Sequence, residues 1–310
     1  MTRGDDARPE ARGETLRLRD GRGLRTFARG PRPAPGGDLV ILEAGLAGGA
    51  GMWSLVMAGL EDAGVSTLAY DRAGYGGSDP AAGPRDVRAL AADLDGLLDL
   101  VEQRWQPARI VLVAHSWGGL IVRIVAAQRS DPAVAGLLLV DPSDEKEDWA
   151  LTRPARLLDR AHAALHPLLA ATGLLRVGTR LALRRLPGRA RAVAVEEIAT
   201  VPSARAIAAE LRAVDASLRA MRADAPDVGR VPLVVVTATR APWFARGVRA
   251  EMLAAHRRTV GDAADGRHVL AEESGHQVML SRPELVVRET LAMLGTGPRH
   301  ARGGVARSRN

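Results

Sequence analysis

Residues 114–119 read Ala-His-Ser-Trp-Gly-Gly and lie between two apolar runs. This pattern predicts a buried strand, a tight turn with Ser116 at its tip, and a helix. The turn strains the serine backbone, so only small residues fit two positions to either side, here Ala114 and Gly118. The strain lifts the Ser116 hydroxyl out of the sheet beside the N-terminus of the helix, where it can act as a nucleophile.

A serine hydroxyl is a weak nucleophile at neutral pH, so it needs a base, a group that orients the base, and donors for the oxyanion. Short apolar strands that alternate with helices must position these groups. The expected strands are 14–19, 22–28, 38–42, 65–70, 109–113, 136–141, 231–237 and 268–271, and the expected helices cover about 52–63, 85–104, the segment after the turn to 129, and 246–259. A last helix opens with Ser281-Arg-Pro-Glu284, which has the spacing of a capping box.

This alternation predicts an α/β fold, with a mostly parallel central sheet and helices on both faces. Residues 145–228 interrupt it, because they are rich in Arg, Ala and Leu at helical spacing and contain no clear strand. We expect these residues to form a helical cap over the active site. The core then comprises residues 14–144 and 229–296. We expect residues 1–13 to form a disordered tail and residues 297–310 to form a disordered basic tail.

Four segments in this order closely resemble motifs of the α/β-hydrolase family, and the likeness covers about residues 14–295. Leu42-Glu-Ala-Gly-Leu46 resembles the oxyanion loop, although Ala44-Gly45 stands where the family usually has His-Gly. The run from Tyr70 to Ser78 is similar to the Asp-x-x-Gly-x-Gly-x-Ser turn, and Ala114 to Gly118 resembles the nucleophile elbow with Ala in its first small position. Ser274-Gly-His276, followed by Arg282-Pro283, resembles the segment that bears the catalytic histidine.

The resemblance implies that His276 takes the proton of Ser116 and later gives it to the leaving group. His268 is a competitor, but it stands at the start of a strand and we expect a structural role for it. The backbone N–H groups of Leu46 and Trp117 are the expected donors to the oxyanion. Their side chains can at the same time form apolar pocket wall.

The triad acid is harder to assign. The family commonly places it after the strand 231–237, where the chain has no Asp or Glu before Glu251. A second location known in the fold is the end of the preceding strand, where Asp141 stands in Leu-Val-Asp-Pro. Asp141 is therefore the expected acid, with Asp144 as the alternate.

The composition narrows the function classes. The formal net charge is +7, but residues 1–35 and 299–310 carry the excess of Arg, and the body between them is close to neutral. With only 3% aromatic residues and no stacking motif, nucleic-acid binding is not expected. The chain has no cysteine. His162 and His166 have a spacing compatible with a metal ion but no carboxylate ligands nearby, so no cofactor or metal is expected. No apolar run reaches the length of a membrane span, and the N-terminus lacks an apolar signal region, so the expected location is cytoplasmic.

These features predict a serine hydrolase that cleaves an ester, thioester or related acyl bond of a small, largely apolar substrate through an acyl-enzyme. Serine at the elbow argues against epoxide-hydrolase chemistry, for which the family uses aspartate there. The alternatives are a cofactor-free perhydrolase or haloperoxidase, and a catalytically weak ligand-binding or signalling protein on the same fold.

Residues 176–186 form a basic amphipathic pattern that fits an anionic membrane or an acidic substrate. The favoured interpretation is a solvated outer face of a cap helix.

Overall fold

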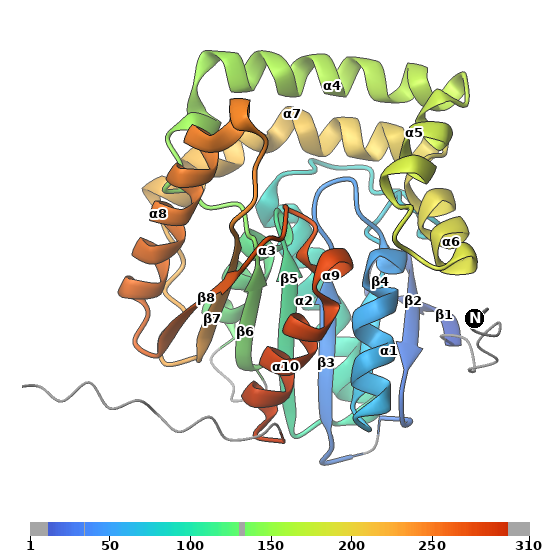
Figure 1. The fold of residues 1–310 in the computed structure, drawn as a ribbon. Coiled ribbons are helices and arrows are strands. Elements are labelled where there is room, and N and C mark those ends of the chain that lie inside the picture. The colour runs from blue at the N-terminus through green and yellow to red at the C-terminus, as the bar shows by residue number, and fades with distance from the viewer. Residues whose placement is uncertain (1–11, 34, 130–133, 297–310) are drawn as a thin grey trace, which may run out of the picture.

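The computed structural model describes residues 12–33, 35–129 and 134–296, with an eight-stranded sheet at the centre (Figure 1). The strand order is β1-β2-β4-β3-β5-β6-β7-β8. β2 runs antiparallel to both of its neighbours, and all other pairs are parallel. The strands are β1 (Arg12–Arg17), β2 (Gly23–Arg29), β3 (Asp38–Glu43), β4 (Ser66–Tyr70), β5 (Arg109–His115), β6 (Val134–Val140), β7 (Leu233–Ala238) and β8 (Gly266–Ala271).

Helices cover both faces of the sheet, because strand side chains alternate between the two faces. Leu39 and Ile41 of β3 pack with α2 (Val87–Trp105) and α3 (Gly118–Gln128). Val40 and Leu42 of the same strand pack on the other side with α1 (Ser54–Asp62) and α10 (Pro283–Leu294). α8 (Arg246–Asp262) connects β7 to β8. The predicted fold class is confirmed.

A helical cap is inserted between β6 and β7. It consists of α4 (Arg153–Ala171), α5 (Leu174–Ala182), α6 (Gly188–Ile198) and α7 (Val201–Ala223), and α4 and α7 lie above the carboxyl ends of the strands (Figure 1). Thr152 and Thr200 cap α4 and α7, and each is followed by Pro in the first turn. None of the helices in the described ranges has the length and apolar character needed to cross a membrane.

The exact division into core and cap stays a prediction. The predicted tail 297–310 lies outside the described residues, and so do residues 1–11 of the predicted tail 1–13. β1 begins two residues before the predicted strand, because Arg12 and Gly13 pair with Ala28 and Phe27 of β2.

The predicted capping box at the last helix is wrong. Ser281 is the last residue of a separate short helix, α9 (Val278–Ser281), and its hydroxyl donates to the Gln277 carbonyl. α10 follows after Arg282, whose guanidinium pairs with Glu284 at 2.7 Å. The Glu284 carboxylate therefore serves an ion pair and does not cap the helix.

Two buried carboxyl groups, Asp71 of the core and Glu197 of the cap, lie where the cap meets the core. Asp71, which follows β4, accepts a hydrogen bond from the Ala50 N–H at 3.0 Å. Glu197 of α6 accepts from the neighbouring Gly51 N–H at 2.8 Å, and its carbonyl accepts from the Gly76 N–H. Burial, assisted by the charge of Asp71, raises the pKa of Glu197 to about 8. The folded protein therefore keeps the Glu197 carboxyl protonated to a higher pH than an unfolded chain does.

Glu197→Gln should reduce the loss of stability that accompanies a rise from mildly acidic to mildly alkaline pH. The folded-state pKa of Glu197 lies above the value in an unfolded chain, so its contribution is present at low pH and is lost as the pH rises through about 8. Glutamine imitates the protonated form at every pH. We expect the melting temperature of the natural protein to fall between mildly acidic and alkaline buffer, and that of the variant to fall less. An equal fall in both proteins would show that Glu197 is not the responsible group.

Candidate active site

The register of two neighbouring strands brings Ser116 and Asp141 together. His115 of β5 pairs with Val140 of β6 in parallel, so the residue that follows each strand leaves the sheet at the same edge. Both residues have positive φ angles, +49° for Ser116 and +44° for Asp141. Positive φ is costly for residues other than glycine, and such strained residues cluster at active sites.

Small neighbours allow the turn at Ser116. A Cβ atom on Gly118 would come within 2.6 Å of the Ala44 carbonyl oxygen, and one on Gly45 would come within 2.8 Å of the His115 ring. Gly119 is equally close to Pro142. A side chain at any of these three glycines would therefore collide with a neighbour, and the requirement for a small residue at Gly118 is the one that the sequence pattern predicts.

A continuous hydrogen-bonded relay joins the three predicted triad residues. His276 lies in the loop after β8, and its Nε2 is 3.0 Å from Ser116 Oγ. Its Nδ1 is 2.7 Å from Asp141 Oδ2. His268 lies apart from this relay and bonds to the Thr237 hydroxyl at 2.7 Å, which is the structural role expected for it.

The Asp141 carboxylate is fully buried and accepts hydrogen bonds from several groups. It accepts from the Ala238 N–H at 2.9 Å, and both of its oxygens lie within 2.9 Å of Arg249 Nη1 on α8. Burial alone would raise the pKa of Asp141, but the hydrogen bond from His276 and the charge of Arg249 hold it below its usual range. Asp141 therefore remains ionised beside the imidazole.

Asp144, the alternate acid, is occupied elsewhere. Its Oδ2 accepts from the Thr259 hydroxyl at 2.6 Å, and its Oδ1 accepts from the Lys146 N–H at 2.9 Å. The bond from Thr259 ties the loop after β6 to α8, and the bond from Lys146 lies within that loop. The geometry therefore favours Asp141 as the partner of His276.

The two expected oxyanion donors, Leu46 and Trp117, line one pocket with Ser116. Trp117 immediately precedes α3 as its N-cap residue, so its N–H lies at the positive end of the helix dipole. Within the described part of the chain, neither backbone N–H donates to another protein group. Both donors are therefore available to a ligand in the pocket.

Arg72 orients the Leu46 donor, a role that the sequence analysis missed. Its buried guanidinium donates to the carbonyl oxygens of Ala44 and Gly45. The Gly45 carbonyl and the Leu46 N–H belong to one trans peptide, so fixing the carbonyl toward Arg72 points the N–H in the opposite direction. Glu210 of the cap helix α7 lies 3.1 Å from the same guanidinium, which links the cap to the oxyanion loop.

His115 supports the backbone of His276. Burial lowers the pKa of His115 to about 3, so its ring is neutral. Its Nε2 lies 2.9 Å from the His276 carbonyl oxygen and donates to it, and the two rings are 4.6 Å apart. Nothing in the sequence pattern distinguishes this role of His115 from ordinary packing.

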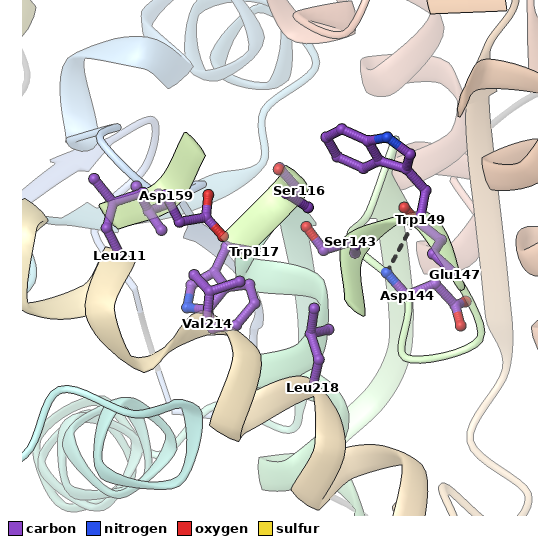
Figure 2. A pocket seen from close by; sticks show the side chains of 13 residues that line it. Ser116, Trp117, Ser143, Asp144, Glu147, Trp149, Asp159, Leu211, Val214 and Leu218 are labelled. Carbon is purple, nitrogen blue, oxygen red and sulfur yellow. Dashed lines mark hydrogen bonds between the residues drawn. The ribbon is translucent and has the colours of Figure 1, made fainter. Parts of the chain in front are cut away.

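A cavity of about 200 Å³ opens beside Ser116. Figure 2 shows Asp159 of α4 and Leu211, Val214 and Leu218 of α7 among the side chains that line it together with Ser116 and Trp117. Most of the residues that line the cavity are apolar. Glu147 is one of the acidic residues in the lining, and burial raises its pKa to about 8. In the described residues, no group of three or more His, Cys, Asp or Glu side chains is placed to hold a metal ion.

A family model described as "Alpha/beta hydrolase family" matches residues 39–289. Over 111 residues the chain is 38% identical to RutD of Klebsiella pneumoniae, a candidate carbamate hydrolase. The matched segment covers 36% of this chain and 40% of that protein. It is also 38% identical over 111 residues to epoxide hydrolase A of Mycobacterium tuberculosis, with coverage of 35% and 33%. The matches thus span less than half of these curated relatives.

Solved structures resemble the chain over most of its length. The enol-lactonase from Burkholderia xenovorans has a TM-score of 0.66 at 20% identity, covering 91% of this chain and all of that one. Epoxide hydrolase A from Mycobacterium thermoresistibile has a TM-score of 0.69 at 21% identity, with coverage of 94% and 100%. At these identities the likeness concerns the fold alone.

Proposed function

The chain belongs to the alpha/beta hydrolase family, and we propose that it is a serine hydrolase that needs no cofactor and cleaves an ester, thioester or related acyl bond through an acyl-enzyme. The observation that carries this proposal is the relay from Ser116 Oγ through His276 to Asp141, with separations of 3.0 and 2.7 Å. These distances are those of working hydrogen bonds between a nucleophile, a base and a group that orients the base.

In the proposed reaction, His276 Nε2 takes the hydroxyl proton while Ser116 Oγ attacks the acyl carbon. The carbonyl oxygen gains negative charge and accepts hydrogen bonds from the Leu46 and Trp117 N–H groups. The imidazolium then protonates the leaving group, and the carbonyl re-forms as an ester on Ser116. Water repeats the sequence, releases the acid and restores the serine, while ionised Asp141 holds the imidazole in one tautomer throughout.

The nucleophile favours acyl substrates over epoxides, although two of the similar proteins are named epoxide hydrolases. Attack of a serine on an epoxide carbon would leave an ether on the enzyme, which water does not readily cleave. Attack on a carbonyl leaves an ester, which the same base and oxyanion donors can hydrolyse. Carbamates and enol-lactones, named for two other similar proteins, also contain such a carbonyl.

The pocket favours a small substrate with an apolar acyl or leaving group. Its volume of about 200 Å³ lies below that of sites for drug-sized ligands. Apolar side chains of Leu46, Leu211, Val214 and Leu218 form much of its wall. Burial of such a group against these residues supplies binding energy, and the Ser116 side chain lies at the edge of the same cavity.

A fluorophosphonate probe tests the proposal. It phosphonylates serines that are activated by a base, so we expect one probe mass on the natural protein and none on Ser116→Ala. Peptide mapping should locate the label on Ser116. A natural protein that remains unlabelled under conditions in which a control esterase reacts would favour a catalytically weak ligand-binding protein.

Arg249 should hold the Asp141 carboxylate in position for the relay. Its guanidinium lies within 2.9 Å of both Asp141 oxygens. Arg249→Met removes these charge-assisted contacts, so the carboxylate orients the His276 imidazole less firmly. We expect kcat to fall by roughly tenfold while KM stays nearly unchanged.

The control for this prediction is Arg246→Met, which removes an exposed arginine one turn earlier on the same helix. Its kcat and KM should match those of the natural protein. If Arg249→Met leaves kcat unchanged, or raises KM and lowers kcat only in step with a loss of thermal stability, then Arg249 does not position the relay.

A further inference from the structure

The outer surface of the cap exposes large apolar side chains to solvent. On α4 and α5 seven of them are between 46% and 68% exposed: Leu157, Leu158, Leu165, Leu168, Leu174, Val177 and Leu181. We call this set the outer apolar patch. Large exposed apolar surfaces are uncommon on monomeric proteins and often mark interaction sites.

The patch follows the periodicity of the two helices. Leu157, Leu165 and Leu168 lie on one side of α4, while Ala155 and Ala163 on the other side are buried toward the rest of the cap. Leu174, Val177 and Leu181 form the same kind of stripe along α5. Figure 1 shows α4 as the outermost helix over α7, with α5 at one end of it. The sequence favours a solvated outer face for 176–186, but on α5 much of the exposed face is apolar.

Positive charge accompanies the patch. Residues 160–195 contain seven Arg and no Asp or Glu, although the chain between its tails is close to neutral. Arg180, Arg184 and Arg185 are exposed. In the ranges that the structure covers, none of these three has an ion-pair partner. The cap surface is therefore both apolar and locally cationic.

We propose that the outer apolar patch docks on an anionic lipid membrane. Leucine and valine side chains enter the boundary between headgroups and acyl chains, and the neighbouring arginines meet lipid phosphates. A second copy of this chain fits less well, because it would bring the same arginines against each other without acidic partners. Because α4 also supplies Ala155 and Asp159 to the pocket, the contact would lie one helix away from Ser116.

Vesicle flotation with the full chain tests this proposal and does not depend on catalysis. We expect binding to vesicles of phosphatidylcholine mixed with phosphatidylglycerol, little binding to phosphatidylcholine alone, and a loss of binding at high salt. Arg184→Gln with Arg185→Gln should weaken binding by roughly tenfold or more, since each arginine near an anionic surface adds to the attraction. Equal binding to both vesicle types, or none to either, would overturn the proposal.

A second pair of variants tests the apolar part. Leu168→Glu with Val177→Glu changes two side chains that are 63% and 68% exposed, so the fold should tolerate both, and we expect binding to be lost. The matched control is Leu270→Glu, an exposed leucine on β8 outside the cap, which should bind as the natural protein does. If the natural protein sediments as a dimer that the double variant dissociates, the patch is a self-association surface and the lipid proposal is wrong.

Discussion

Ser116→Ala is expected to lower the turnover of small p-nitrophenyl esters by several orders of magnitude while the fold stays intact. The variant keeps the pocket and the two proposed oxyanion donors but has no atom at position 116 that can form the proposed acyl-enzyme. Loss of any one member of a triad removes most of the rate, because the members act as a unit. Steady-state kcat/KM measures the loss, and circular dichroism checks the fold.

Ser143→Ala is the matched control, since Ser143 is a second serine in the lining of the same pocket. Its hydroxyl takes no part in the relay, so its turnover should stay within a few-fold of that of the natural protein. Turnover by Ser116→Ala at the natural rate would mean that another group performs the hydrolysis.

Asp141→Asn should lower the rate by about a thousandfold or more with a much smaller effect on folding. Asparagine has nearly the same size, but its amide cannot hold the imidazole in the required tautomer or stabilise the imidazolium. It also weakens the pairing with Arg249, so thermal stability should be measured beside kcat/KM. Asp144→Asn should lower the rate only slightly, because Asp144 bonds to Thr259 and the Lys146 N–H and not to the relay. A severe loss in Asp144→Asn with a mild one in Asp141→Asn would reverse the assignment of the acid.

The sequence predicted the features that depend on local pattern. The elbow at Ser116 could be predicted because strand, strained turn and helix follow each other directly, and the small residues around the serine are a steric requirement. The sheet and the cap could be predicted from the alternation of apolar runs and from its interruption. The position of Asp141 could be predicted because strand ends of a parallel sheet share one edge.

The features that the sequence analysis missed depend on residues far apart in the chain. Arg249 is 108 residues from Asp141, and no motif relates a helix arginine to a strand-end carboxylate. Arg72 lies within a recognised motif, but its bonds to the oxyanion loop follow only from the packing of β4 beside β3. The capping box failed for a related reason, since Ser281 has the right spacing but already belongs to α9.

The most direct measurement is the capture of the acyl-enzyme. The protein is mixed with a p-nitrophenyl ester, quenched in acid during turnover, digested and analysed by mass spectrometry. If Ser116 is the nucleophile, the peptide that contains it gains the mass of the acyl group, and a burst of p-nitrophenolate accompanies its formation. Hydrolysis without a burst and without any acyl group on Ser116, in a protein whose Ser116→Ala variant hydrolyses the ester equally fast, would contradict the proposed function.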